Sequence, residues 1–133
     1  MEISAMNVLI VEDDPATAHF FLQVITSRDY STPHIAHSAE EALSMAIRTT
    51  YDLITLDVQL PGISGLEILS VIRNLHPHAI IAIISGHVSE NISQDIVNCA
   101  DVIIKKPVAI EKLEKLLKST DNICKEMANI RAL

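Results

Sequence analysis

The stretch that decides the fold is Leu53-Ile54-Thr55-Leu56-Asp57, which continues as Val58-Gln59-Leu60-Pro61-Gly62. Its first part is a short, mostly apolar run, typical of a strand that is covered on both faces of a sheet. The Pro61-Gly62 dipeptide predicts a turn, within a loop over residues 58–64. The predicted strand therefore ends in an acid, Asp57, at the edge of a buried sheet.

Similar apolar runs occur on both sides of this stretch. They predict strands over residues 8–11, 32–36, 79–84 and 101–104. Helical patterns between them predict helices over 15–27, 38–48, 65–75 and 88–98, and a last helix from about Val108. Strands that alternate with helices indicate parallel strands joined by right-handed crossovers. The predicted fold class is α/β, a doubly wound (βα)5 flavodoxin-like sandwich with the parallel sheet order 2-1-3-4-5.

The spacing of apolar residues also predicts which side of each helix faces the core. Ser38 is expected to cap the second helix, because Glu41 follows it by three residues, as in a capping box. The residues predicted to face inward on the first three helices are Phe20, Phe21, Val24, Ile25, Ala42, Leu43, Ala46, Ile47, Leu66, Leu69, Ile72 and Leu75.

Composition narrows the function classes. The 133 residues carry a net charge of −7 and no basic stripe, so we expect no nucleic-acid binding by this chain itself. The two cysteines, Cys99 and Cys124, have no CxxC spacing and are expected to be free thiols in a reducing cytosol. The sequence shows no signal-peptide pattern and no apolar run of the roughly 18–20 residues that a membrane span needs. A cytoplasmic location without membrane binding is therefore predicted.

The C-terminal segment is ambiguous. One domain is predicted over residues 1–120, and residues 121–133 are predicted to be a helical extension or linker. Apolar residues follow a heptad spacing that would suit a dimer, at Leu113, Leu116, Thr120, Ile123, Met127 and Ile130. However, residues 119–122 are poor helix formers, so the last helix either continues through them or breaks there.

Several chemically active side chains follow the predicted strands. Glu12 and Asp13 follow the first strand, Asp57 ends the third, Ser85 follows the fourth and Lys106 follows the last. Ligands bind beyond the carboxyl ends of the strands in an open parallel sheet, so these groups are expected to converge. Clustered carboxylates need a cation, and Mg²⁺ with its oxygen ligands is the natural one. A carboxylate there can act as a nucleophile and form an aspartyl phosphate, with the metal and the lysine stabilising charge.

Four motifs, in this order and at this spacing, resemble the receiver family of response regulators over about residues 6–118. They are Val8-Leu9-Ile10-Val11-Glu12-Asp13-Asp14, then Asp52 to Gly65, then Ile84-Ser85-Gly86, then Lys106-Pro107. Each motif alone is weak, but the set is specific. The resemblance implies a stand-alone or fused receiver domain, that is, a signalling phosphoacceptor and not an enzyme that acts on an external substrate.

The resemblance also implies individual roles. Asp57 would take a phosphoryl group from a histidine kinase or phosphotransfer protein. Asp13 would bind Mg²⁺ directly, Glu12 through water, and Gln59 through its backbone carbonyl. Lys106 would pair with Asp57 and later with the phosphate, next to a cis Lys106-Pro107 bond. Asp14 is expected to cap the first helix rather than to bind metal.

The expected switch departs from the family pattern at one position. Ser85 would turn toward the phosphate and bias the surface around the fourth helix and fifth strand. The family usually has an aromatic residue three positions before the lysine, whereas this chain has Ile103. Ile103 cannot report the flip of a ring, so the resemblance does not define the form of the output, whereas the phosphorylation chemistry is not affected. His87 and Gln59 flank the expected phosphate and could tune its lifetime.

Two other functions fit part of the pattern. A degenerate receiver would act as a docking or dimerisation module without phosphorylation, but the complete set of acids with Ser85 and Lys106 argues against it. A phosphatase with an aspartyl nucleophile often has a second acid two residues further on, where this chain has Gln59. The predicted partners are thus a histidine kinase or phosphotransfer protein, a possible fused output domain and a possible second copy of the chain.

Overall fold

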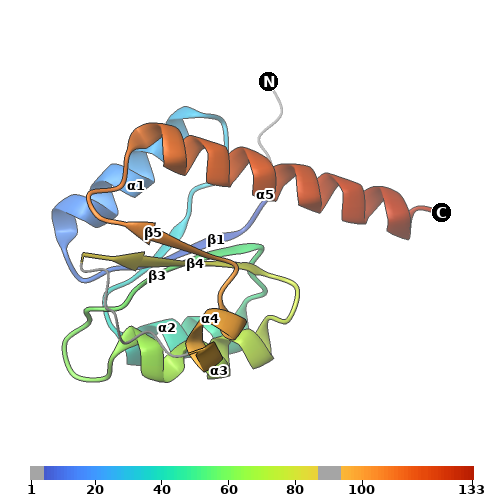
Figure 1. The fold of residues 1–133 in the computed structure, drawn as a ribbon. Coiled ribbons are helices and arrows are strands. Elements are labelled where there is room, and N and C mark those ends of the chain that lie inside the picture. The colour runs from blue at the N-terminus through green and yellow to red at the C-terminus, as the bar shows by residue number, and fades with distance from the viewer. Residues whose placement is uncertain (1–4, 87–93) are drawn as a thin grey trace.

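The structure is a computed structural model, which describes residues 5–86 and 94–133. Strands and helices alternate along the whole of this range (Figure 1). In chain order they are β1 Val8–Val11, α1 Pro15–Ser27, β2 His34–Ala36, α2 Ala39–Arg48, β3 Leu53–Asp57, α3 Gly65–Leu75, β4 Ile80–Ser85, α4 Gln94–Cys99, β5 Val102–Lys105 and α5 Ile110–Arg131. The predicted helix over 88–98 lies partly outside the described residues, and its described part is α4.

The strands form one parallel sheet in the order β2-β1-β3-β4-β5, which confirms the predicted fold class. In Figure 1, α1 and α5 cover one face of the sheet, and α2, α3 and α4 cover the other. β1 and β3 are hydrogen-bonded neighbours, with Val11 opposite Leu56. Their carboxyl ends therefore lie side by side at one edge of the sheet, which sets the position of the site.

The molecule has two separate cores, one on each face of the sheet. Alternate residues of a strand pack into one core or the other, because successive side chains point to opposite faces. Leu9 and Val11 pack under α2 and α3, whereas Val8 and Ile10 pack under α1 and α5. Both cores consist mainly of aliphatic side chains, as the composition predicts. The continuous apolar runs of the sequence thus reflect burial on both faces.

Some local predictions are wrong. Ile47 is 71% exposed, because α2 buries a narrow face of small residues, Ala39, Ala42 and Ala46. Leu75 lies exposed at the end of α3, whereas the unpredicted Ile68 is buried. On α1, Phe20 packs against the core as predicted, although it is only partly buried, and Ala18 is buried without having been predicted.

Strand β2 begins two residues later than predicted. It starts at His34, directly after Pro33, and pairs with β1 from that residue on. Proline has no N–H to donate to a ladder, so regular pairing begins after it. The other strands differ from their predicted bounds by one residue at most.

Helix α5 is continuous through residues 119–122 (Figure 1). Thr120 is buried and its hydroxyl donates to the Leu116 carbonyl at 2.8 Å, while Asp121 forms an ion pair with Lys125 one turn on. These contacts offset the low helix propensity of the segment. Of the heptad positions, Leu113 and Thr120 are buried in the protein's own core, so they cannot form part of an intermolecular seam. A separate role for residues 121–133 stays a prediction.

None of the described helices combines the length and the hydropathy that crossing a membrane would require.

Candidate functional site

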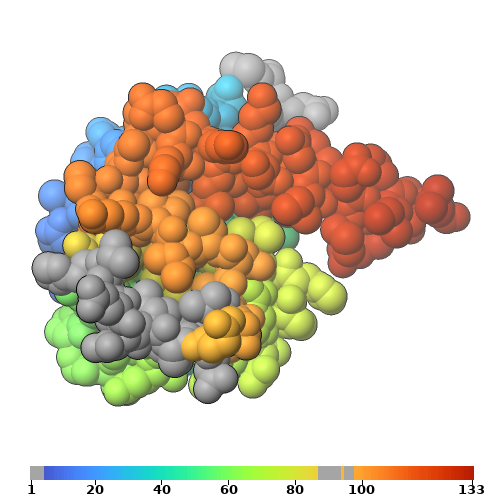
Figure 2. Space-filling model, in the orientation of Figure 1, coloured from blue at the N-terminus to red at the C-terminus, as the bar shows by residue number. Residues whose placement is uncertain are grey.

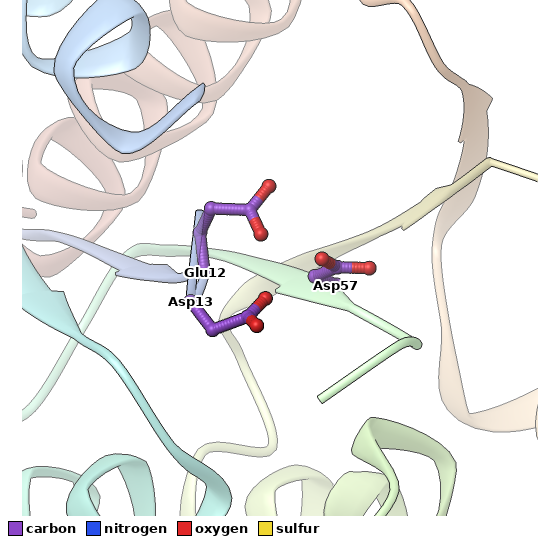
Figure 3. Close-up of side chains that lie close together, drawn as sticks. All are labelled: Glu12, Asp13 and Asp57. Carbon is purple, nitrogen blue, oxygen red and sulfur yellow. The ribbon is translucent and has the colours of Figure 1, made fainter. Parts of the chain in front are cut away.

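Three carboxylates meet where β1 and β3 end. Glu12 and Asp13 directly follow β1, and Asp57 is the last residue of β3. Figure 3 shows the three side chains gathered beyond the ends of the two strands. One carboxylate oxygen from each residue lies within 4.8 Å of the other two. Glu12 and Asp57 are buried, whereas Asp13 is exposed, so the cluster opens to solvent on the side of Asp13.

Lys106, which directly follows the edge strand β5, brings a positive charge to this cluster. Its Nζ donates to Glu12 Oε1 at 2.9 Å and to Asp57 Oδ2 at 3.0 Å. The Lys106 backbone N–H donates to the Ser85 carbonyl at 2.7 Å, which extends the pairing of β5 with β4 by one step. The Lys106-Pro107 bond is cis, as the resemblance implies. The structure thus brings Glu12, Asp13, Asp57 and Lys106 together, as the sequence predicts.

The charges at the site are not balanced. Burial is the main cause that raises the pKa of Glu12 to about 7, and the neighbouring Asp57 raises it further against the effect of Lys106. For Lys106, burial lowers the pKa, but the hydrogen bonds to Glu12 and Asp57 outweigh it and leave the pKa raised. Three carboxylates around one ammonium leave excess negative charge, which a cation would neutralise.

The loop after β3 is held in place by its own polar groups. The Gln59 backbone N–H donates to Asp57 Oδ1 at 2.9 Å, which fixes the orientation of the Asp57 carboxylate. Ser64 caps α3 by accepting from the Leu66 N–H, and its hydroxyl lies 3.3 Å from the Val58 carbonyl that it donates to. The side chain of Gln59 is exposed at the mouth of the site.

Gly65 is a site-shaping residue that the sequence analysis quoted only as part of a motif. A Cβ atom at this position would collide with the backbone carbonyl of Asp57. Only glycine therefore lets the first turn of α3 pack against the end of β3. The sequence does carry a signal for this close approach. Gly65 is the first residue of α3, directly after the cap residue Ser64, and glycine is a poor helix former.

Asp14 is the cap of α1 and not a member of the cluster. Its carboxylate accepts from the backbone N–H of Thr17 at 3.1 Å and from the Thr17 hydroxyl at 2.6 Å. These hydrogen bonds lower the pKa of Asp14. The prediction that Asp14 caps the helix is confirmed.

The two predicted switch residues lie on neighbouring strands. Ser85 is buried at the end of β4, one strand away from Asp57, with Asp57 opposite Ile84 in the ladder. Ile103 pairs with Ile83 in β5 and is 42% exposed, on the opposite side of the sheet from the buried Ile104. His87 lies outside the described residues.

The donor set fits a hard divalent cation. Glu12, Asp13 and Asp57 offer only oxygen ligands, and Mg²⁺ is held in proteins by one or two carboxylates together with water and phosphate oxygens. The exposed Asp13 faces the side from which a hydrated cation could enter. The cluster is therefore compatible with Mg²⁺ binding.

The comparisons with known proteins agree with this geometry. Residues 8–118 match the family model described as "Response regulator receiver domain". The chain belongs to this family. It is 36% identical over 107 residues to "Response regulator ArlR" of Staphylococcus haemolyticus, a match that covers 80% of this receiver chain and 48% of that protein. The chain thus spans about half the length of this curated relative.

Two solved structures are similar to this receiver domain. One is the response regulator TrrA from Thermotoga maritima in complex with Mg(2+)-BeF, with 29% identity and a TM-score of 0.76 over 86% of this chain and 98% of that one. The other is a response regulator from Burkholderia pseudomallei with a phosphorylated aspartic acid, a calcium ion and citrate. It has 25% identity and a TM-score of 0.77, over 95% of this chain and 74% of that one.

Proposed function

We propose that Asp57 of this receiver domain accepts a phosphoryl group from a phosphohistidine, with Mg²⁺ bound at Glu12, Asp13 and Asp57. The observation that carries the proposal is the shared hydrogen bonding of Lys106 to Glu12 and Asp57, at 2.9 and 3.0 Å, beside the exposed Asp13. This arrangement supports the proposal, because it groups a carboxylate that could act as a nucleophile with a countercharge and with oxygen atoms that could bind a cation. The phosphorylated aspartic acid in the Burkholderia structure and the Mg(2+)-BeF complex of TrrA support it by analogy.

The chemical step is a displacement at phosphorus. A carboxylate oxygen of Asp57 forms a bond to the phosphorus atom, and the bond from phosphorus to the histidine nitrogen breaks. The leaving nitrogen keeps the electron pair and can take up a proton. Such transfers depend mainly on positioning and on the stabilisation of charge. Here the Gln59 N–H orients the Asp57 carboxylate. The Lys106 ammonium pairs with this carboxylate and could pair with the phosphoryl oxygens after the transfer.

The cation would supply the charge that Lys106 alone cannot. Asp13 and Asp57 would hold it directly, Glu12 through water, and the Gln59 backbone carbonyl would complete the protein ligands. This division of roles follows the resemblance. When bound, the cation neutralises the excess negative charge and stabilises the charge that develops on the transferring group.

The donor is proposed to be a histidine kinase or phosphotransfer protein that covers the carboxyl edge of the sheet. A groove of about 560 Å³ lies directly beside Lys106, lined by Ala16, Thr17, Phe20, Phe21, Lys106, Pro107 and Val108. The lining of this groove is mostly apolar, so a partner protein could bury apolar surface against it, next to the reacting atoms. This proposal assigns no chemistry on an external substrate to the chain and places it in the cytoplasm.

The output is proposed to run through Ser85. A hydroxyl at the end of β4 can turn toward a phosphoryl group on Asp57, and the phosphorylated state is then favoured by that contact. Ile103 contributes no ring and no hydroxyl to this response. Because ArlR is about twice the length of the matched segment, a fused output domain is a further part of the proposal.

Phosphoryl uptake from acetyl phosphate tests the proposed function. With Mg²⁺, intact mass spectrometry should show one added phosphoryl group on the native chain and on Ser85→Ala. Asp57→Ala should show none, and chelation of Mg²⁺ should abolish the uptake. The matched control is Asp52→Ala, which removes an acid at the opposite end of β3. Absence of uptake, or equal uptake by Asp57→Ala, would favour a docking module that works without phosphorylation.

A further inference from the structure

The C-terminal part of α5 extends beyond the body of the protein. The first half of the helix packs on the sheet through Leu113 and Leu117, which are almost fully buried. The C-terminal end of the helix projects past the amino edge of the sheet (Figure 1), and it stands clear of the other elements in the space-filling view (Figure 2). We call residues 123–133 the overhang.

An apolar stripe runs along the overhang. Ile123 is 46% exposed, Ile130 is 58% exposed, and Met127 between them is partly buried. Their spacing of four and three residues puts them on one helical face. At about 100° per residue, this face lies about a quarter of a turn from the line of Leu113, Leu117, Thr120 and Cys124 that packs on the domain. Another helix could therefore cover the stripe without displacing α5 from the sheet.

Charged residues flank the stripe on both sides. In the heptad that places Ile123 and Ile130 at d and Met127 at a, Glu126 takes position g and Arg131 takes position e. Both are exposed, and neither forms an ion pair with another described residue of the chain. By contrast, the exposed Lys125, at position f of the same heptad, pairs with the mostly buried Asp121 at 3.0 Å.

We propose that the overhang binds the overhang of a second copy of this chain, in parallel. The seam is Ile123, Met127 and Ile130, and Glu126 of each copy pairs with Arg131 of the other. A g position faces the e position of the following heptad in a parallel pair, which joins these opposite charges twice. In an antiparallel pair g faces g and e faces e, which brings like charges together. The charge pattern therefore selects both the partner and its direction.

The position of the overhang is compatible with the proposed function but does not depend on it. α5 begins at Ile110, four residues after Lys106, and runs toward the amino edge of the sheet, where Asp52 precedes β3 (Figure 1). The overhang thus leaves the domain at the edge opposite Asp57. A phosphodonor can reach Asp57 in either copy of the dimer.

Sedimentation equilibrium of the full chain tests the seam. The native chain should dimerise reversibly, with a dissociation constant below roughly 1 mM. The double variant Ile123→Asp, Ile130→Asp should weaken dimerisation at least about tenfold, because both apolar contacts are lost and like charges are introduced. Ile47→Asp is the matched control, since Ile47 is equally apolar, 71% exposed and on α2, and it should leave the dimer unchanged. A native chain that stays monomeric, or a dimer that survives the double variant, would overturn the proposal.

Charge exchange tests the direction of the pair with substitutions that do not touch the core. Glu126→Arg and Arg131→Glu should each weaken the dimer about threefold to tenfold, because two attractive pairs become repulsive. The double variant Glu126→Arg, Arg131→Glu should restore native affinity. Failure of the double variant to recover would overturn the parallel pairing. Circular dichroism should show equal helix content for all variants, and uptake of phosphoryl groups at Asp57 should be unaffected, which separates this test from that of the proposed function.

Discussion

At the carboxyl edge of the sheet three carboxylates share one ammonium, whereas at the amino edge the guanidinium of Arg73 is matched by hydrogen bonds within the chain. Arg73, at the end of α3, donates to the carbonyls of Cys99 and Ala79 at 2.9 and 2.7 Å and to Asp101 Oδ2 at 2.6 Å. The same Asp101 oxygen accepts from the Ile81 N–H at 2.8 Å. This network joins α3, α4, β4 and β5, and its charges need nothing from outside the chain.

The aromatic groups at the amino edge are satisfied in the same way. His76 is buried, and its Nε2 donates to the Ala46 carbonyl at 2.9 Å because a carbonyl can only accept. The His34 ring contacts the Tyr51 hydroxyl at 2.7 Å. The polar groups at the amino edge are thus satisfied within the chain and stabilise the fold. The carboxyl edge instead holds an excess of negative charge, which lowers stability and suits a cation.

The largest expected effect is on the amino edge. Arg73→Met should lower the free energy of unfolding by about 2–4 kcal/mol, because it leaves Asp101 and two partly buried carbonyls without their charged donor. Urea denaturation measures the change. Arg48→Met is the control, because Arg48 is an exposed arginine on α2. Its free energy of unfolding should stay within about 0.5 kcal/mol of the native value. Equal effects of the two substitutions would show that the network does not support the fold.

The next effect is a pH dependence at the carboxyl edge. The pKa of Glu12 is about 7 in the folded chain against a usual value of 4.5, so the folded state holds this proton longer than the unfolded state. Without Mg²⁺, stability should therefore fall as the pH rises from about 4.5 to about 7, by roughly 1–3 kcal/mol. Glu12→Gln should remove this part of the slope in urea denaturation across that pH range. An unchanged slope in Glu12→Gln would contradict the burial of an excess charge.

The smallest effect concerns the middle of the sheet, between the two edges. Among the described residues, Thr55 carries the buried side-chain oxygen that has no hydrogen-bond partner. Thr55→Val should raise the free energy of unfolding by about 1 kcal/mol, because it removes an unsatisfied hydroxyl at nearly constant volume. Thr120→Val is the matched control, since that buried hydroxyl is bonded to Leu116 and its removal should not stabilise. Destabilisation by Thr55→Val would indicate that the hydroxyl has a partner after all.

The carboxyl edge was more predictable from the sequence than the amino edge. Asp57, Glu12 and Asp13 stand at the ends of apolar runs, and parallel topology alone brings such positions together. The Arg73 network was not predicted, because its partners are backbone carbonyls that depend on how α3 and α4 end. The exposure of Ile47 was also missed, since helical spacing does not tell how wide a face the neighbouring elements cover. The close approach of Gly65 to Asp57 likewise exists only once α3 is packed on β3.

The most direct test of the central claim is the effect of Mg²⁺ on stability at pH 8. If Glu12, Asp13 and Asp57 form a cation site, Mg²⁺ should raise the free energy of unfolding of the native chain by about 2.7 kcal/mol when present at about a hundred times its dissociation constant. Arg73→Met should show the same increment from its lower baseline, and Asp13→Asn should lose most of it. An increment that is absent in the native chain, or undiminished in Asp13→Asn, would contradict the account.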